Sequence, residues 1–318
     1  MDGQTPRALH RYAVFLACAI VALIAAGGLV KSLEAGLSVP DWPTSYGGLN
    51  PPRWWEIENV RAEHGHRLFA GTVALLTVGL AIWAARREPR LWVRRLAYTA
   101  VAAVLFQAIL GGVTVLLFLP PAVSVSHAAL AQLYLCVIVT IALVTSRSWL
   151  ERSPVASGAG ALRGLVTGTT GLIFLQTLAG ALVRHTGSGL AIPDFPLMFG
   201  GLWPPEIDFS VAVQLVHRFG ALLVTLAIAM IWLRVFRSAD RRGLAAPTLW
   251  LGIFLLIQVA LGATIIWTGR AVLPNTLHVP NGAALLATSL ILTLRVRRAS
   301  TAGDSDEGLG EGSSAAPA

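Results

Sequence analysis

The chain has 318 residues, of which 55% are hydrophobic and only 13% are charged. A soluble domain typically carries about a quarter charged residues, so this composition excludes an ordinary soluble protein and predicts an integral membrane protein. The formal net charge of +8 also suits a nucleic-acid-binding surface, and the positions of the basic residues decide between these two classes.

Eight apolar runs are long enough to cross a bilayer, which takes about 20 helical residues. In chain order they lie at residues 11–32, 66–85, 94–118, 124–146, 162–184, 212–234, 247–268 and 275–295. Arginines precede the first run and cluster after every even-numbered run, whereas the loops after the odd-numbered runs carry fewer basic residues. The positive-inside rule therefore places both termini in the cytoplasm. The basic residues set the topology in a cell membrane, so we expect lipid and no nucleic acid around the protein.

The loop after the first run is repeated after the fifth run. GLSVPDWPTSYGGLNPP (36–52) matches GLAIPDFPLMFGGLWPP (189–205), and downstream FQAILGGVT (106–114) matches IQVALGAT (257–264). An even number of spans in each half keeps both halves in the same orientation, as in a parallel duplication. We therefore predict an all-α integral membrane protein, whose eight transmembrane helices form two tandem pseudo-symmetric four-helix bundles with cytoplasmic termini.

The predicted organisation has five parts. They are a cytoplasmic N-terminal tail (1–10), a first bundle (11–146), a cytoplasmic linker (147–161), a second bundle (162–298) and a C-terminal tail (299–318). The tail is rich in Gly, Ser, Ala and acidic residues, which predicts disorder. The two cysteines, Cys18 and Cys136, fall inside predicted spans and indicate small buried side chains rather than a disulfide framework.

Four histidines recur at matched places in the two halves. His66 and His127 are separated by 61 residues, as are His217 and His278, and all four lie near the outer ends of the even-numbered helices. A single histidine at a helix end is usually a hydrogen-bonding group, but two imidazoles at one depth in a four-helix bundle suit axial ligation of a heme iron. A zinc site would need a third or fourth ligand near each pair, and the sequence shows none.

Glycines gather near the outer ends of the odd-numbered helices, where they either let helix backbones approach or leave room for a porphyrin; both interpretations stay open. They are Gly27, Gly28, Gly111, Gly112, Gly180 and Gly262. Three histidines fall outside the repeated pattern and are predicted to be structural or solvent-facing: His10, His64 and His185.

The halves differ one turn before the first histidine of each pair. The first half reads EHGHR, with Glu63, and the second reads QLVHR, with Gln214. Positions i and i+3 share a helix face, so Glu63 is expected beside whatever His66 binds, where a carboxylate can take a proton or stabilise positive charge. The alternatives are an acid that favours the helix dipole or a surface partner for Arg67. The difference predicts a reactive first half and a redox cofactor in the second.

Two arginines directly follow these histidines, and the repeated loops lie over the same end. Arg67 and Arg218 suit either heme propionates or lipid headgroups. Asp41 and Asp194, between prolines, are predicted turn residues. The aromatic residues of the loops, Trp42, Trp54, Trp55, Phe195 and Trp203, fit an interfacial belt, and we expect each loop to cover the mouth of its bundle.

Together these residues resemble the heme A synthase family over roughly residues 10–298. The resemblance lies in E-x-x-H-R at Glu63 to Arg67, in H-R at His217, in His127 and His278, and in the doubled GL-x-x-PD-[WF]-P loop. It implies a permanent heme b held by His217 and His278 in the second bundle. It also implies a substrate site for heme O at His66 and His127, with Glu63 as the catalytic carboxylate.

The resemblance further implies an oxidoreductase that converts a methyl group of heme O to the formyl group of heme A by successive hydroxylations and loss of water. In this family the oxygen is thought to come from water, with electrons leaving through the hemes. Heme O synthase, a farnesyltransferase, and the assembly of cytochrome oxidase are the implied partners. The chain departs from many family members in having no cysteine pair in its first outer loop, residues 33–62, which puts a thiol-based role in doubt.

An iron with two histidine ligands has no open position. Either one ligand leaves during turnover, or the oxidation proceeds without substrate binding at that iron. The main alternative function is a diheme b-type membrane cytochrome that only transfers electrons, for which Glu63 against Gln214 would be incidental. A transporter, the other alternative, would show polar or broken helices near the membrane midplane.

Overall fold

The protein is built from helices joined by two long loops. The computed structural model describes residues 5–151, 155–156 and 158–310, with side chains described from Arg7 to Ala299. The helices are α1 (Thr5–Ser32), α2 (Glu58–Arg87), α3 (Leu91–Leu116), α4 (Pro121–Val144), α5 (Arg147–Leu150), α6 (Arg163–His185), α7 (Phe209–Arg237), α8 (Ala245–Trp267) and α9 (Val272–Gly310), with short 3₁₀ turns at Ala159–Leu162 and Ser188–Leu190.

Eight of these helices are long and apolar enough to cross a membrane. Each coincides with one of the eight apolar runs, so the prediction of an all-helical, multi-pass membrane protein is confirmed. The short α5 lies in the predicted linker, of which residues 152–154 and 157 are outside the described part.

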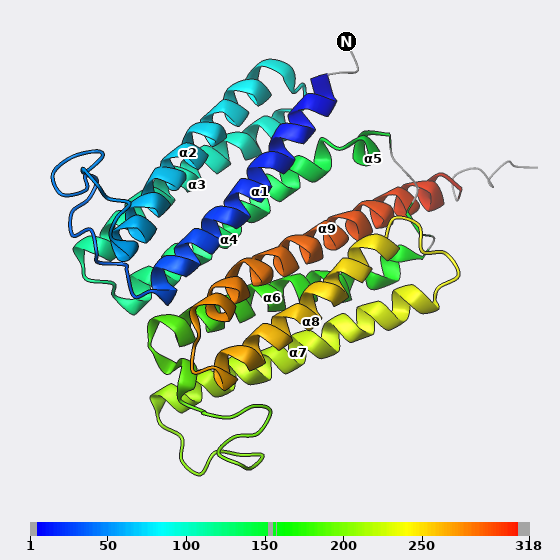
Figure 1. Ribbon diagram of the computed structural model, residues 1–318. Helices are drawn as coiled ribbons and strands as arrows, with labels where there is room; N and C mark the ends of the chain where they lie inside the picture. Colours follow the sequence, from blue (N-terminus) through cyan, green and yellow to red (C-terminus); the bar gives the residue numbers. More distant parts are fainter. Residues whose placement is uncertain (1–4, 152–154, 157, 311–318) are drawn as a thin grey trace, which may run out of the picture.

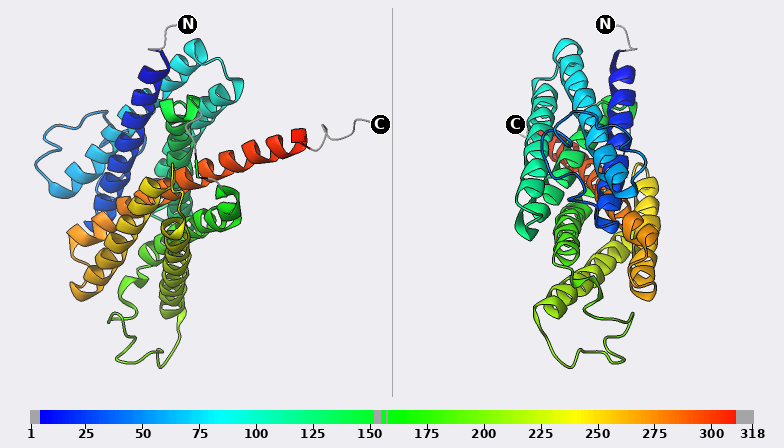
Figure 2. Two further views of the ribbon diagram at one scale, coloured as in Figure 1. Left: turned by 90° about the vertical axis from the view of Figure 1, so that its right-hand side faces the viewer. Right: turned by 60° about the vertical axis from the view of Figure 1, so that its left-hand side comes forward.

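The long helices lie in two groups, and within each group every helix packs on two others. In the first group α1 packs on α2 and α4, and α3 packs between α2 and α4; in the second group α6, α7, α8 and α9 repeat this cycle. The groups meet where α1 packs on α9 and where α4 packs on α6 and α9. Figure 1 shows them side by side, with the loops after α1 and α6 at the same end, and Figure 2 shows this from two further directions.

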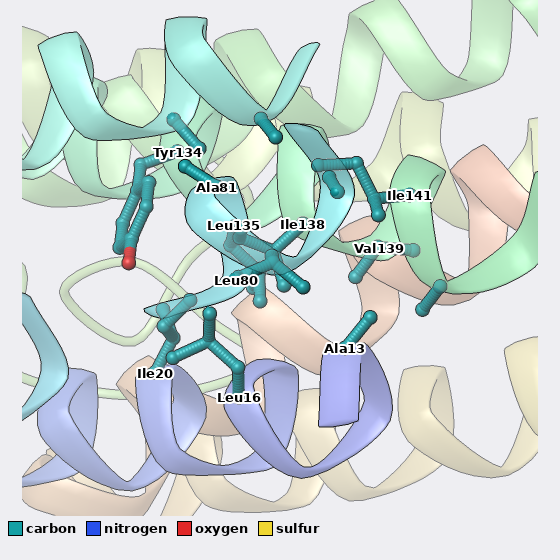
Figure 3. Packing of buried hydrophobic residues seen from close by; sticks show 14 of the residues in the cluster. Ala13, Leu16, Ile20, Leu80, Ala81, Tyr134, Leu135, Ile138, Val139 and Ile141 are labelled. Carbon is teal, nitrogen blue, oxygen red and sulfur yellow. The ribbon is translucent and has the colours of Figure 1, made fainter. Parts of the chain in front are cut away.

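The interior of the first group is packed with aliphatic side chains away from the long loops (Figure 3). Ala13, Leu16 and Ile20 of α1 meet Leu80 and Ala81 of α2 and Tyr134, Leu135, Ile138, Val139 and Ile141 of α4. Tyr134 hydrogen-bonds the hydroxyl of Thr77, so its polar atom has a partner inside the apolar cluster.

Arg184, near the end of α6, joins the two groups at the loop end. Its Nη2 donates to the Gly28 carbonyl at 2.5 Å and to Ser32 Oγ at 2.8 Å, both on α1. Its Nη1 donates to the Asn275 carbonyl on α9 at 2.8 Å. One half-buried guanidinium therefore holds three helices, and charge-assisted hydrogen bonds of this kind are among the strong ones in proteins.

The ends of the chain differ from the predicted boundaries. Helix α1 already begins at Thr5, inside the segment 1–10 that we expected to be a tail. Helix α9 continues to Gly310, because hydrogen bonding propagates from its preceding turns more easily than a new helix begins, so it enters the predicted disordered tail. Residues 311–318 of that tail lie outside the described part of the chain.

Candidate functional site

Each of the four matched histidines lies against a glycine of the preceding long helix. The fit is so close that an added Cβ would meet the Cε1 atom of the imidazole. The distance would be 2.9 Å from Gly180 to His217, 3.1 Å from Gly27 to His66, 3.2 Å from Gly111 to His127, and 3.4 Å from Gly262 to His278. These four glycines therefore leave room for the imidazole rings, a use that differs from both interpretations offered by the sequence.

The histidines come together in two pairs. His217 and His278 have ring centroids 6.5 Å apart and planes inclined by 66°, and His66 and His127 lie against glycines of the corresponding helices in the first group. All four residues are half-buried. The structure thus brings together the residues that the equal spacing predicted as pairs, one pair in each helix group.

The imidazoles of His66, His127 and His278 form no hydrogen bond to any described residue, and their Nδ1 atoms are buried without a partner. Buried polar atoms are normally satisfied, so hydrogen bonding within the protein does not account for the position of these rings. No group of three or more His, Cys, Asp or Glu side chains within the described residues could hold a metal ion. Paired imidazoles with no third ligand match the axial donor set of a heme iron better than a zinc site.

Arg67 anchors the first loop to α2, one residue after His66. Its Nη1 donates to the carbonyls of Asp41 (2.6 Å) and Thr44 (3.0 Å), and its Nη2 donates to the Val39 carbonyl (2.8 Å) and to Glu63 Oε1 (2.6 Å). Both terminal nitrogens are therefore held by the protein itself. The predicted contact of this guanidinium with a heme propionate stays a prediction.

Arg218 holds the second loop in the same way. Its Nη2 donates to the carbonyls of Ile192 (3.1 Å) and Asp194 (2.7 Å), and its Nη1 donates to the Leu197 carbonyl (3.0 Å). These acceptors occupy the places of Val39, Asp41 and Thr44 in the repeated loop sequence. The residue after each histidine thus ties a loop over the site, and a propionate contact of Arg218 is likewise still a prediction.

Asp41 and Asp194 each close a tight turn at the tip of a loop. Asp41 accepts from the amides of Tyr46 (2.6 Å) and Gly47 (2.8 Å) and from the Thr44 hydroxyl (2.5 Å). The Thr44 hydroxyl, followed by the Gly47 amide, lowers the pKa of Asp41 to about 2. Asp194 accepts from the amides of Phe199 and Gly200. The two carboxylates are turn residues, as predicted.

Glu63 and Gln214 are both buried, with 3% of each residue exposed. Each accepts a hydrogen bond from a backbone amide of its loop. Glu63 Oε2 accepts from the Val39 amide at 2.8 Å, and Gln214 Oε1 accepts from the Ile192 amide at 2.5 Å. The second bond differs, because Glu63 pairs with Arg67 whereas the Gln214 amide donates to the Gly189 carbonyl at 2.9 Å. The first site therefore has a buried carboxylate–guanidinium pair where the second has a neutral amide.

The sequence did not predict where the side chain of Trp42 packs, because we assigned this residue only to an aromatic belt at the membrane interface. The indole packs on Gly112 of α3 so closely that a side chain there would overlap it. Gly112 follows Gly111, which carries the His127 ring. In the second loop Phe195 instead contacts Trp267, with ring centroids 6.3 Å apart. The first half has two glycines, Gly111 and Gly112, where the second half has a glycine and an alanine at 262–263. This difference is the sequence signal that could have revealed where Trp42 packs.

Two of the remaining histidines have structural roles. His64 is buried, with its Nδ1 2.9 Å from the Ser45 hydroxyl, and its ring contacts Trp54. His10 Nδ1 lies 2.8 Å from the Ala142 carbonyl. Both contacts fit the prediction that these residues stand outside the paired sites, and His185 is half-buried.

Comparison with known proteins shows similarity along nearly the whole chain. The COX15-CtaA family model, described as cytochrome oxidase assembly protein, matches residues 10–290. Heme A synthase from Symbiobacterium thermophilum is 31% identical over 79% of this chain and 84% of the relative. Heme A synthases from Halalkalibacterium halodurans (27% identical; 91% and 95%) and Caulobacter vibrioides (28% identical; 93% and 98%) are also similar.

We predict that acid weakens the turn that Asp41 stabilises in the first loop. Because the pKa of Asp41 is lowered from 3.8 to about 2, its carboxylate stabilises the turn fully above about pH 4 and loses this effect as the pH falls through about 2. Hydrogen exchange of the Tyr46 and Gly47 amides, corrected for the intrinsic rate, should show protection disappearing in this window. Thr44→Val should move the loss to higher pH. Protection that is the same at pH 4 and pH 2 would contradict the assignment.

Proposed function

The chain belongs to the COX15-CtaA family of cytochrome oxidase assembly proteins, and from this membership we propose that it is a heme A synthase. The proposed reaction oxidises a methyl group of heme O to the formyl group of heme A. Taking the oxygen atom from water, this conversion releases four electrons and four protons. The observation that carries the proposal is the presence of two imidazole pairs, one in each helix group, with no third His, Cys, Asp or Glu ligand beside them among the described residues.

The two pairs are proposed to hold different hemes. The imidazoles of His217 and His278 would hold a permanent heme b, and those of His66 and His127 would hold heme O as the substrate. The short distance between the His217 and His278 rings and the glycines against all four rings support this fit. When bound, the heme irons supply the one-electron steps by which electrons leave the substrate.

Glu63 is proposed to accept a proton released from the substrate methyl group. It lies one turn before His66 on the same face of α2 and is buried beside Arg67. Its two oxygens already accept from the Val39 amide and from Arg67. Proton uptake would weaken both bonds, since a neutral carboxyl group is a poorer acceptor than a carboxylate. The first loop would therefore loosen when Glu63 is protonated.

The membrane arrangement is proposed from the sequence together with the helix packing. The two groups would be tandem pseudo-symmetric bundles, with cytoplasmic termini and the histidines near the outer face of the cell membrane. The arginine distribution and the matching anchors Arg67 and Arg218 support this arrangement. Heme O would come from heme O synthase, and the product would serve the assembly of cytochrome oxidase.

A diheme b-type cytochrome that only transfers electrons is the second candidate. The observation that favours it is the matching anchoring by Glu63 and Gln214, which gives Glu63 a structural task of its own. The two functions differ in whether the carboxylate is needed beyond that task, and this difference can be tested directly.

Glu63→Gln should abolish formation of heme A while heme b is retained. Gln214 shows that an amide can hold the loop from this position, so the variant should assemble. Without a carboxylate at the first site, we expect a loss of product of at least about 100-fold, within the range for a lost general base. The purified protein, supplied with heme O, would be assayed for formyl-bearing heme by chromatography. Wild-type yield in Glu63→Gln would favour the electron-transfer protein.

Replacing one histidine of each pair should separate the two sites. His217→Leu should abolish the tightly held heme b, because the remaining His278 cannot supply both axial ligands, whereas His66→Leu should retain it. The measurement is the heme-to-protein ratio of the purified variants, from the Soret band and pyridine hemochrome. The reverse outcome would exchange the roles of the two helix groups.

The glycines predict a graded effect in the second site. Gly180→Ala places a Cβ 2.9 Å from the His217 ring, closer than real Cβ contacts, whereas Gly262→Ala places one 3.4 Å from the His278 ring, an ordinary contact. We expect Gly180→Ala to lose most of its heme b and Gly262→Ala to keep most of it. Equal heme contents in the two variants would show that ring placement by these glycines does not govern binding.

A further inference from the structure

Gln176 of α6 singles out one of the four imidazoles. Its Nε2 lies 2.9 Å from His217 Nδ1 and donates to the His217 carbonyl at 2.7 Å. Among the described residues, no other of the four rings has a polar side chain on Nδ1; those of His66, His127 and His278 are buried and partnerless. The two helix groups therefore differ in the support of a histidine, as well as at Glu63.

The equivalent place in the first group is apolar. Gln176 lies one turn before Gly180, which carries His217, and Leu23 lies one turn before Gly27, which carries His66. Leu23 packs against the hydrophobic cluster of α1, α2 and α4. A leucine offers no acceptor to an imidazole N–H, so His66 has no support of this kind.

A second position changes together with the first. Gly220, three residues after His217, leaves the space that the Gln176 amide fills, since a side chain there would overlap the amide oxygen. Three residues after His66 the chain has Phe69, which packs against the same cluster as Leu23. The second group thus has an amide and a glycine at these two positions, where the first has a leucine and a phenylalanine.

We propose that Gln176 is a positioning residue that makes His217 a permanent ligand of heme b. At the equivalent place in the first group, Leu23 gives His66 no such support, which leaves the heme at that site exchangeable. This inference rests on the proposed function. An imidazole that binds iron through Nε2 carries its proton on Nδ1, and metal-ligating histidines nearly always donate this proton to an acceptor. To accept this proton, the Gln176 amide has to make a half-turn that presents its oxygen to Nδ1, and in the heme-bound state this turn gives up the bond that Nε2 donates to the His217 carbonyl.

The hydrogen bond has two consequences for the bound heme. It fixes the ring and its tautomer, which slows loss of the ligand, and it makes the imidazole a stronger donor. A stronger donor favours ferric over ferrous iron and lowers the reduction potential of the heme. A substrate site needs the opposite property, because heme A has to leave after it is formed.

The test compares three variants of the full-length protein, purified with heme b. Gln176→Leu should lose heme to added apomyoglobin about 10-fold faster, the lower end of the usual effect of such partners, and its midpoint potential should rise. Gln176→Glu, which has nearly the same shape and a stronger acceptor, should lower the potential. Gln258→Leu is the matched control, because the Gln258 amide donates to the backbone carbonyl of His278 and to no imidazole; its potential should equal that of the wild type.

The opposite signs of the two Gln176 variants distinguish a role in ligand support from a merely structural role, and Gln176→Glu suffices if Gln176→Leu does not assemble. Wild-type heme loss in Gln176→Leu, or a potential that does not fall in Gln176→Glu, would overturn the inference alone. A wild-type protein that binds no heme b would overturn the proposed function and the inference with it.

Discussion

The close packing of an imidazole on a glycine backbone is the constraint on which both candidate sites depend. It recurs four times, each time between neighbouring long helices, and among the described residues only the His217 ring also has a hydrogen-bonding side chain, Gln176, on its Nδ1. A helix pair can come this close only where one side lacks a Cβ. The spacing of helices at the loop end is therefore set by the rings, while aliphatic packing sets it further along the first group.

The loops depend on the same positions through the next residue in the chain. Arg67 follows His66 and Arg218 follows His217, and each guanidinium gathers the carbonyls of its own loop. A shift of the histidine along its helix would move the arginine with it, so ring position and loop position are coupled. The further contacts differ between the loops: in the first, Trp42 packs on Gly112 and Glu63 forms an ion pair with Arg67, and in the second, Trp267 donates to the Phe195 carbonyl.

Hydropathy and repetition predicted the eight helices and the grouping of the four histidines, because both depend on local composition and on equal spacing. The partners of Arg67, Trp42 and Gln176 could not be predicted in this way. Each is a contact between segments far apart in the chain, and a side chain with several donors or a large ring has many acceptable partners. The Glu63 difference was visible in the sequence, but its backbone partner, Val39, depended on how the loop folds back.

Arg184 adds a consequence for how the halves work together. Its guanidinium bonds the carbonyl of Gly28, the residue after the glycine that lies against His66. It also bonds the carbonyl of Asn275, three residues before His278. A tilt of α1 at its loop end would therefore strain the same side chain that bonds α9. The loop ends of the two helix groups are thus fastened to each other through one side chain of α6, so the two groups are not free to move independently there.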